Sequence, residues 1–345
     1  MKKYNVAIVG ATGMVGHTLV QVLQERNFPV GGLKLLASAR SVDQEIKVLG
    51  RNYRVEEARP EAFDGIDIAF FSAGTDVSLE LAPEAARRGA VVVDNSNAFR
   101  MDEGVPLVVP EVNPDALAVH SGIIANPNCS TIQLVVALQP LQEAAGLKRV
   151  VVSSYQAVSG AGKEAVDELA AQARAILEGR DDFPRECFPH ANAKVQQQMA
   201  FNLVPQIDVF VENGYSKEEM KIIRETRKIM GLPDLRITST TVRVPVFNGH
   251  SEAVNVEFER PLSAAEAREV LAKAPGIVII DNPDELEYPM PAVISGRDEV
   301  FVGRIRPDES VPYGINMWVV ADNIRKGAAT NSIQIAETLI ARGQL

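Results

Sequence analysis

The stretch VAIVGATGMVG, residues 6–16, decides the fold of the first part of the chain. Its four leading apolar residues predict a buried strand, and the apolar spacing of residues 17–23 predicts a helix after it. Glycines at 10, 13 and 16 lie between the two elements, where they let the backbone turn tightly and approach a ligand closely. The helix start then offers amides and a positive dipole end to a pyrophosphate. We therefore predict a dinucleotide-binding turn; a glycine turn without a ligand is the alternative.

Strands alternate with helices through the residues that follow. Further apolar runs predict strands at residues 33–37, 66–71, 91–94 and 122–125. Residues 77–88 predict a helix that stops at Gly89. Strands and helices joined by short connections form a parallel, doubly wound sheet, so the expected class is α/β, with ligands beyond the carboxyl ends of the strands.

Small and polar residues follow several of these strands. The segment Ser38-Ala39-Arg40-Ser41 ends the second strand, where an NAD-preferring domain usually carries Asp or Glu. A cation flanked by hydroxyls favours the 2′-phosphate of NADP instead, unless Arg40 is merely solvated. Ser72 to Thr75 and Asn95 follow two other strands, and Arg100 beyond them is either an anion ligand or a surface arginine.

The hexapeptide NPNCST, residues 126–131, follows the strand at 122–125. Pro127 forces a turn, and Ser130 and Thr131 are good helix-start residues. Cys129 therefore lies at a helix N-terminus, where amides and the helix dipole favour the thiolate that nucleophilic catalysis needs. A small buried hydrophobe is the alternative. Cys187 has no helix start beside it, and we interpret it as structural.

The second part of the chain has a different character. Strands are predicted at residues 148–155, 236–246, 253–258, 278–281, 301–306 and 314–321, and helices at 163–177, 217–230, 264–272 and 328–341. Strands in runs with long connections predict an α+β domain with a mainly antiparallel sheet. The last helix carries one apolar stripe, which could pack back onto the first domain. We predict an NADP-binding domain of residues 1–128 completed by 324–345, and a catalytic and dimerisation domain of residues 129–323.

Four side chains of this second part are candidates for a site. His250 lies in a glycine turn between two predicted strands, where functional side chains are often presented, although a solvated loop histidine is the commoner case. Strand alternation puts Arg243 on the same face as Thr241. Glu218 and Lys221 are three residues apart on one helix face, which by default is a surface ion pair.

Composition narrows the class of protein. The net charge of −10, without a run of lysine or arginine, argues against nucleic-acid or electrostatic membrane binding. No stretch approaches the ~20 apolar residues that span a bilayer. Two cysteines in 345 residues favour a reduced, cytoplasmic protein.

A cofactor-type domain followed by a cysteine at a helix start indicates thiolate attack on an acyl carbon, with hydride exchanged with a nicotinamide. Six segments carry a resemblance to a known family: GATGMVG (10–16), SARS (38–41), NCST (128–131), YQAVSG (155–160), RVPV (243–246) and GHS (249–251). In these segments, and from residue 6 to about residue 339, the sequence resembles the aspartate-β-semialdehyde dehydrogenase family. Thr241 is a departure, because many members carry cysteine there, but that position is not catalytic in the family.

The resemblance implies NADPH-dependent conversion of L-aspartyl 4-phosphate to aspartate semialdehyde and phosphate, in lysine, threonine and methionine biosynthesis, by a homodimer. It implies these catalytic residues: Cys129 as nucleophile, His250 as acid/base, Gln156 orienting the acyl group, and Asn128. It implies these substrate ligands: Arg243 for the carboxylate, Glu218 or else Glu219 for the amino group, and Arg100 and Lys221 for the phosphate. It places these residues at NADP: Gly10, Thr12, Gly13, Met14, Val15, Gly16, Ser38, Arg40, Ser41, Ser72, Ala73, Gly74, Thr75, Asn95, Ser159, Gly160 and Asn323. No metal ligand is assigned.

Two alternatives remain open from the sequence. N-acetyl-γ-glutamyl-phosphate reductase uses the same thiolate chemistry on a larger acyl phosphate, but an acetylated amine would not need a carboxylate such as Glu218. A non-catalytic NADP-binding regulator could be built on the same fold, and it should tolerate the loss of Cys129 and His250.

Overall fold

The computed structural model describes residues 2–48 and 50–345, and it divides into two compact units. Unit 1 comprises Met1–Asn128 and Gly327–Leu345, and unit 2 comprises Cys129–Lys326. The chain returns to unit 1 at Gly327, whereas the sequence placed this return at residue 324.

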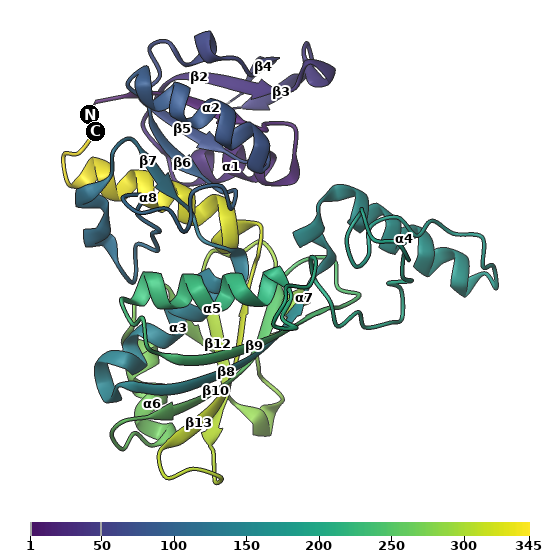
Figure 1. Ribbon diagram of the computed structural model, residues 1–345, viewed down its shortest axis with the longest axis vertical. Helices are drawn as coiled ribbons and strands as arrows, with labels where there is room; N and C mark the ends of the chain where they lie inside the picture. The colour runs from purple at the N-terminus through teal and green to yellow at the C-terminus, as the bar shows by residue number, and fades with distance from the viewer. Residues whose placement is uncertain (1, 49) are drawn as a thin grey trace. The chain divides into compact units, whose positions relative to one another are not determined.

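Unit 1 is built on a seven-stranded sheet in the order β3-β4-β2-β1-β5-β6-β7 (Figure 1). Its strands are β1 (Tyr4–Val9), β2 (Val30–Ala37), β3 (Glu45–Val48), β4 (Arg51–Glu57), β5 (Ile68–Phe71), β6 (Val91–Asp94) and β7 (Ile123–Ala125). Every neighbouring pair is parallel except β3 with β4. The predicted doubly wound parallel sheet is therefore confirmed.

The antiparallel hairpin of β3 and β4 is an element that the sequence did not reveal. It lies at the edge of the sheet, and most of its side chains are exposed or half-buried, with Val48 and Val55 buried. Charged residues occupy the exposed positions, so no apolar run marks these strands.

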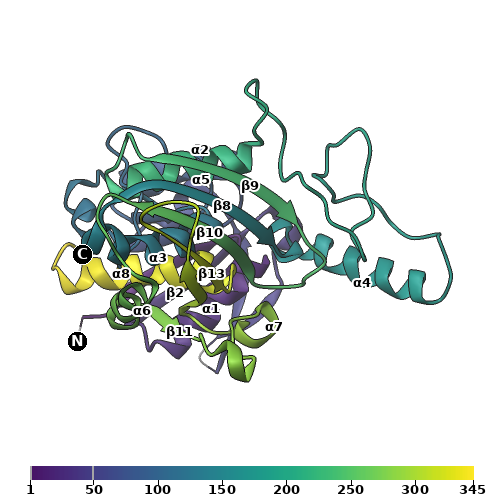
Figure 2. The same cartoon turned by 90° about the horizontal axis from the view of Figure 1, so that it is seen from below.

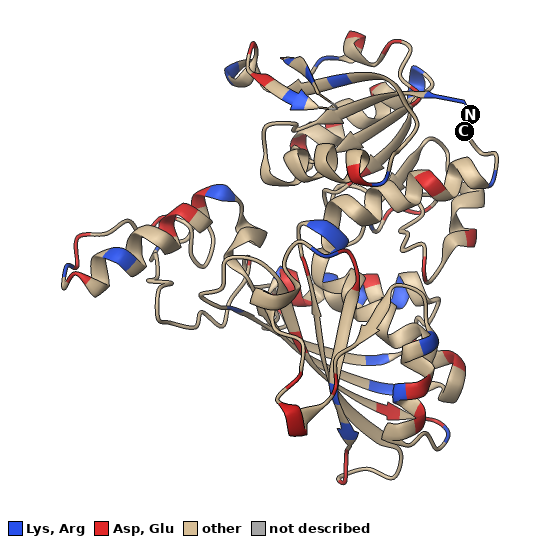
Figure 3. Ribbon diagram, turned by 180° about the vertical axis from the view of Figure 1, so that it is seen from behind, with Lys and Arg blue, Asp and Glu red and all other residues tan. Residues whose placement is uncertain are grey.

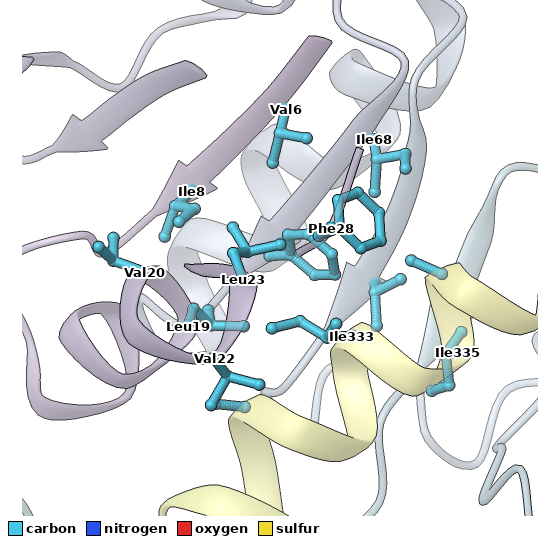
Figure 4. Close-up of a cluster of buried hydrophobic side chains, with 14 of the residues drawn as sticks. Val6, Ile8, Leu19, Val20, Val22, Leu23, Phe28, Ile68, Ile333 and Ile335 are labelled. Atoms are coloured by element: carbon cyan, nitrogen blue, oxygen red, sulfur yellow. The ribbon is translucent and has the colours of Figure 1, made fainter. Parts of the chain in front are cut away.

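The helices of unit 1 are α1 (Met14–Glu25), α2 (Thr75–Arg87) and α8 (Thr330–Ala341), and α8 follows a π-helical turn, η6 (Arg325–Ala329). Short 3₁₀ helices occur at η1 (Ala39–Ser41), η2 (Pro60–Phe63) and η3 (Pro114–Val119). Figure 4 shows the side chains of α8 against those of α1 and the strands, with Ile333 next to Leu19 and Leu23. The predicted apolar stripe of the last helix thus contributes to the core of unit 1, with Leu339 fully buried.

Unit 2 is built on a six-stranded sheet in the order β11-β12-β13-β10-β8-β9. The strands are β8 (Leu147–Gln156), β9 (Arg236–Arg243), β10 (His250–Phe258), β11 (Ile277–Ile279), β12 (Val300–Pro307) and β13 (Gly314–Ala321). The pairs β8–β10, β10–β13 and β12–β13 are antiparallel, and β8–β9 and β11–β12 are parallel. The prediction of a mainly antiparallel sheet is confirmed.

Three helices pack on this sheet, namely α3 (Cys129–Ala145), α5 (Lys217–Met230) and α6 (Ala264–Lys273). Burial alternates along β8 and β9, so every second side chain faces the interior and the others are half-buried or exposed. Helix α4 (Lys163–Leu177) and the loop after it project from the rest of unit 2 (Figure 2). The remaining short elements are η4 (Val158–Ala161), η5 (Pro283–Glu285) and α7 (Pro291–Ile294).

Two predicted strand boundaries in unit 2 are wrong in a way that matters for the site. β9 ends at Arg243 rather than at residue 246, and β10 begins at His250 rather than at residue 253. His250 is therefore the first residue of a strand and is fully buried, not a solvated side chain in a turn. The strand pairs from its first residue, because His250 stands opposite Ala321 of β13.

The distribution of charged residues and the apolar character of the helices agree with the expectations from composition. Acidic and basic residues are interspersed along both units (Figure 3). Within residues 2–48 and 50–345, no helix combines the length and apolar character that crossing a bilayer would require.

We predict that Leu339→Ala destabilises the protein by about 2–5 kcal/mol, because it opens a cavity where α8 packs in the core of unit 1. The matched control is Leu79→Ala on α2, since Leu79 is 51% exposed and its truncation should stay within about 0.5 kcal/mol of wild type. Urea denaturation followed by circular dichroism measures both. Equal effects of the two substitutions would contradict the packing role of α8.

Candidate active site

The glycine turn of unit 1 has the backbone form that a pyrophosphate site requires. Gly10 has φ +85°, and a Cβ atom there would stand 2.8 Å from the backbone of Ser72. A Cβ at Gly16 would overlap the carbonyl oxygen of Gly10, so α1 approaches the turn closely only because both residues are glycine. Gly13 is exposed at the start of α1, and no side chain of the described residues caps that helix. The first amides of α1 can therefore bind a phosphate group, and the turn fits a dinucleotide.

Two other predicted cofactor segments lie at the same end of the unit 1 sheet. Thr12 Oγ1 donates to Ser41 Oγ at 3.5 Å, which places the segment 38–41 beside the glycine turn, with the Arg40 side chain exposed. Ser72 Oγ donates to the carbonyl oxygen of Val9 at 3.1 Å, so the segment 72–75 begins at the end of β1. Hydroxyls and an exposed guanidinium here can bind the 2′-phosphate of a dinucleotide.

Arg100 is buried, so the interpretation as a surface arginine is wrong. Its Nε donates to the carbonyl oxygen of Asn126 at 2.9 Å, and its Nη2 donates to that of Asn95 at 2.8 Å. The Asn95 side chain is also engaged: its Nδ2 donates to Phe71, and its Oδ1 accepts from Asn126 and from Ser332 of α8. The structure thus brings Asn95 and Arg100 together, and it uses the Asn95 side chain to tie the strand ends to α8.

In unit 2, Cys129 is the first residue of α3, as predicted, and it is half-buried. Asn128, directly before it, is buried. Arg243, the last residue of β9, is close enough to Cys129 that the two charges interact, and this interaction raises the pKa of the guanidinium against the larger lowering caused by burial. By the same interaction, the positive charge of Arg243 stabilises a thiolate on Cys129, in addition to the helix start.

His250 is held in one orientation and one tautomer. The amide of Ala157 donates to its Nδ1 at 3.0 Å, so the neutral ring carries its proton on Nε2. Burial lowers the pKa of His250 to about 3, Arg243 acts in the same direction and Glu218 opposes both. Within the described residues Nε2 has no hydrogen-bond partner. The site therefore contains a neutral N–H donor that lacks an acceptor, as expected where a substrate oxygen binds.

Arg243 and His250 both face Gly160 of η4. Arg243 Nη1 donates to the carbonyl oxygen of Ala157 at 2.8 Å. A Cβ atom at Gly160 would stand 3.0 Å from that Nη1 atom and 3.2 Å from His250 Nε2. Glycine at this position keeps open the space in front of both donors.

A second group of polar side chains joins the ends of β8 and α5. Gln156 is the last residue of β8, and its Nε2 donates to Glu218 Oε1 at 3.3 Å and to Ser154 Oγ at 3.2 Å. The other oxygen of Glu218 pairs with Lys221 Nζ at 3.0 Å, and Lys221 also pairs with Asp208 at 3.3 Å. Glu218 is 5% exposed, so the default interpretation as a surface ion pair is wrong.

The structure also distinguishes Glu218 from Glu219. Glu219 forms a capping box with Ser216 at the start of α5, and its other carboxylate oxygen accepts from the amide of Thr241. Glu218 instead acts electrostatically on both Arg243 and His250. Glu219 therefore stabilises the start of α5, whereas Glu218 is the carboxylate that acts on the candidate residues Arg243 and His250.

Ser159 and Asn323 lie beside the loop that leads into His250. Asn323 Oδ1 accepts from the amide of Gly249 at 2.8 Å, and its Nδ2 donates to Ser159 Oγ at 3.0 Å. Ser159 also contacts Asn248 Oδ1 at 3.1 Å. Both predicted cofactor residues are thus buried in a network that fixes the residues before β10.

Several residues of these networks escaped the sequence reasoning. They are Asn126 and Ser332 in unit 1 and Ala157, Asp208, Asn248 and Asp322 in unit 2. Asp322 accepts from Asn248 Nδ2 and from the amide of Gly296, which fixes the same loop. Ala157 acts only through its backbone, and a backbone role leaves no signal in residue type. The others are separated along the chain from the residues they hold.

The comparisons with known proteins agree along the whole chain. Residues 5–120 match the family described as semialdehyde dehydrogenase, NAD binding domain, and residues 138–326 match semialdehyde dehydrogenase, dimerisation domain. The aspartate-semialdehyde dehydrogenase of Aquifex aeolicus (strain VF5) is 57% identical over 343 residues, 99% of each chain.

Two solved structures extend the similarity to the fold. The crystal structure of Vibrio cholerae aspartate semialdehyde dehydrogenase II complexed with ASA has a TM-score of 0.93 at 48% identity, with 99% of each chain covered. The Candida albicans enzyme with NADP has a TM-score of 0.76 at 26% identity, with 100% of each chain covered. The chain belongs to the aspartate-semialdehyde dehydrogenase family.

Proposed function

We propose that this protein reduces L-aspartyl 4-phosphate to L-aspartate 4-semialdehyde with release of phosphate, at the expense of NADPH, in the biosynthesis of lysine, threonine and methionine. The observation that carries the proposal is the arrangement of Cys129, Arg243 and His250 in unit 2: a half-buried thiol at a helix start, a cation that stabilises its thiolate, and a neutral N–H donor without an acceptor. The names of the similar enzymes support the substrate.

The proposed cofactor is NADP, held by the glycine turn at 10–16 and the segments 38–41 and 72–75 of unit 1. The fit of the turn and the exposed Arg40 beside Ser41 support it, as does the Candida albicans enzyme with NADP. When bound, the nicotinamide supplies the hydride that the reduction consumes.

The chain's own residues account for the covalent step. The Cys129 thiolate attacks the acyl carbon, a C–S bond forms, the C–O bond to phosphate breaks, and phosphate leaves a thioester on Cys129. Each change at that carbon passes through a tetrahedral form with negative charge on oxygen. His250 Nε2–H donates a hydrogen bond to that oxygen and stabilises its negative charge until the carbonyl reforms and the phosphate or the thiolate leaves. Gln156 orients the acyl group from the end of β8.

The charged residues are assigned to the charged groups of the substrate. Arg243 binds the carboxylate bidentately, Glu218 binds the ammonium, and Lys221 and Arg100 bind the phosphate. Lys221 already pairs with Glu218 and Asp208, so an incoming phosphate exchanges one anionic partner for another.

The sister activity on N-acetyl-γ-glutamyl phosphate is the second candidate within this chemistry. The buried carboxylate of Glu218 favours the aspartyl substrate, because a carboxylate suits a free ammonium, whereas an acetylated amine carries no charge to attract it. The buried donor Nε2 of His250 argues against a non-catalytic regulator, since a regulator needs no such group.

We also propose a homodimer and a cytoplasmic location. The similarity of residues 138–326 to a dimerisation domain supports the dimer. The low cysteine content, two residues in 345, supports a reducing compartment.

The test is NADPH formation in the reverse direction, followed by absorbance with aspartate semialdehyde, NADP and phosphate. We expect phosphate-dependent NADPH formation, none with N-acetylglutamate semialdehyde, and slower reduction of NAD. Cys129→Ala should abolish turnover while NADP still binds, as measured by calorimetry. Turnover retained in that variant would exclude the thiolate mechanism, and activity only with the acetylated substrate would assign the sister reaction.

We predict that Gly160→Ala lowers kcat/KM about tenfold or more, equivalent to about 1.4 kcal/mol, because the new methyl group fills the space before Arg243 and His250. Gly31→Ala in β2 is the control, since a Cβ there would stand 3.2 Å from Lys3 Cβ, a contact as tight as the one with His250 Nε2 but remote in sequence from these residues. Steady-state kinetics measure both. Wild-type turnover in Gly160→Ala would show that substrate does not use this space.

We predict that the buried, neutral His250 lowers the free energy of unfolding as the pH falls below 7. Its pKa is about 3 in the native protein against about 6.5 when unfolded, so between these values only the unfolded chain takes up the proton. Between pH 7 and pH 5 this costs about 2 kcal/mol of stability. His250→Asn keeps an acceptor for the Ala157 amide and should remove that loss in urea denaturation. His17→Asn, on the exposed side of α1, is the control and should follow wild type; an unaltered pH dependence in His250→Asn would refute the assignment.

A further inference from the structure

Glu252 is a fully buried carboxyl that the proposed chemistry does not use. It lies on β10 two residues after His250, and so on the same face of the strand. Its neighbours across the sheet are Ser154 of β8 and Val319 of β13, neither of which carries a charge.

Gln133 faces this position from helix α3. It lies one turn after Cys129, on the same face of the helix, and it is fully buried. Its Nε2 points to the carbonyl oxygen of Val319 at 3.5 Å, the residue that stands opposite Glu252 in the sheet. Glu252 thus lies next to His250 on one face of the strand, and Gln133 lies next to Cys129 on one face of the helix.

The two side chains leave three oxygen atoms without a satisfactory partner. Among the described residues, neither carboxyl oxygen of Glu252 nor Oε1 of Gln133 has a partner at the distance and angle of a hydrogen bond. If Glu252 were ionised, all three atoms would be acceptors, and no arrangement of the pair could satisfy Gln133 Oε1. One proton on Glu252 changes this: its O–H donates to Gln133 Oε1, and Gln133 Nε2 donates to the other carboxyl oxygen.

We propose that Glu252 is a neutral carboxylic acid paired with Gln133, and that this uncharged pair positions the strand of His250 against the helix of Cys129. Glu252 is a positioning residue in this arrangement, because it acts through the elements that carry the reacting groups. An unpaired carboxylate in the same place would leave a buried charge without compensation, which is far more costly than a paired neutral acid.

The electrostatics of the surroundings agree. Burial raises the pKa of Glu252 well above its ordinary value, opposed only by hydrogen bonding from Gln133. The other titratable groups on the elements packed around it are Cys129 and Glu143 on α3, Lys148, Arg149 and Tyr155 on β8, and His250 and Glu257 on β10 itself. The interior faces of β8 and β13 next to Glu252 present Ser154 and Val319, which do not titrate.

The neutral state has a consequence for the nucleophile, which rests on the proposed role of Cys129. A negative charge on Glu252, whose partner Gln133 lies one helical turn after Cys129, would oppose Arg243 and disfavour the thiolate. A neutral acid supplies the hydrogen bonds of the pair and leaves the positive potential at Cys129 intact.

The protonation state is tested by infrared spectroscopy of the purified protein at pH 7.5, independently of activity. We expect the carbonyl stretch of a protonated carboxylic acid in wild type and its absence in Glu252→Gln. Should Glu252→Gln not fold, carbon-13-labelled glutamate in wild type assigns the band by its shift. Absence of any such band from wild type would overturn the proposal.

The positioning role is tested with swapped partners. Gln133→Glu places two carboxyls where one proton is shared, so a negative charge remains near Cys129. We expect it to raise the apparent pKa of Cys129 alkylation by about one unit or more. The double variant Glu252→Gln/Gln133→Glu restores one acid and one amide in exchanged positions, and should return the alkylation profile to that of wild type.

Alkylation is read at Cys129 by peptide mass spectrometry, where Cys187 does not interfere and its own pKa is raised to about 12 by burial and neighbouring carboxylates. An unshifted profile in Gln133→Glu, or no recovery in the folded double variant, would contradict the pair. Because this readout needs neither substrate nor cofactor, it can fail while the proposed activity stands, and the converse also holds.

Discussion

The backbone of Ala157 is the point on which the geometry of unit 2 depends. Its amide donates to His250 Nδ1 and its carbonyl oxygen accepts from Arg243 Nη1, so one residue orients the imidazole and the guanidinium together. The residues around it are fixed in turn by the loop before β10, because the amides of Val158 and Ser159 donate to the carbonyl oxygens of Val246 and Phe247. Side chains held in this way lose little further freedom when a substrate binds, which is the basis of preorganised catalysis.

The balance of charges in unit 2 follows from that geometry. Arg243 is buried, and the anionic groups that act on its charge are Glu218 and Cys129. A buried guanidinium is costly unless anions offset it, so the arrangement favours a carboxylate on Glu218, a thiolate on Cys129 and, when present, an anionic substrate. The same cation helps to keep His250 neutral, which preserves an N–H donor at Nε2. A neutral Glu252 behind these groups would add hydrogen bonds without altering this balance.

The candidate site of unit 1 differs from that of unit 2, because its glycine turn offers backbone amides rather than charged side chains. Its strands end in a region of glycine and small residues, where the contacts of Gly10 with Ser72 and of Gly16 with Gly10 leave no room for a side chain. Helix α8 also belongs to this unit. Its Asn331 and Ser332 donate hydrogen bonds to Asn126 and Asn95, which follow two of the strands. The final segment of the chain is therefore an integral part of unit 1.

The sequence by itself determined the doubly wound parallel sheet, the mainly antiparallel second sheet and the position of Cys129 at a helix start. These features depend on apolar periodicity, glycine and proline, which act over a few residues and can be read directly. It could not determine the edge hairpin of β3 and β4, whose exposed faces carry charges in place of an apolar run.

Only the tertiary structure decided which polar side chains are buried and what they contact. It placed His250 at the start of a strand, buried Arg100 and Glu218, assigned Glu219 to a helix cap, and set Glu252 opposite Gln133. Burial of a polar group depends on what residues distant in the chain place around it, and the local pattern contains no record of those neighbours. For the same reason the tautomer of His250 follows from a single amide donated by Ala157, 93 residues earlier in the chain.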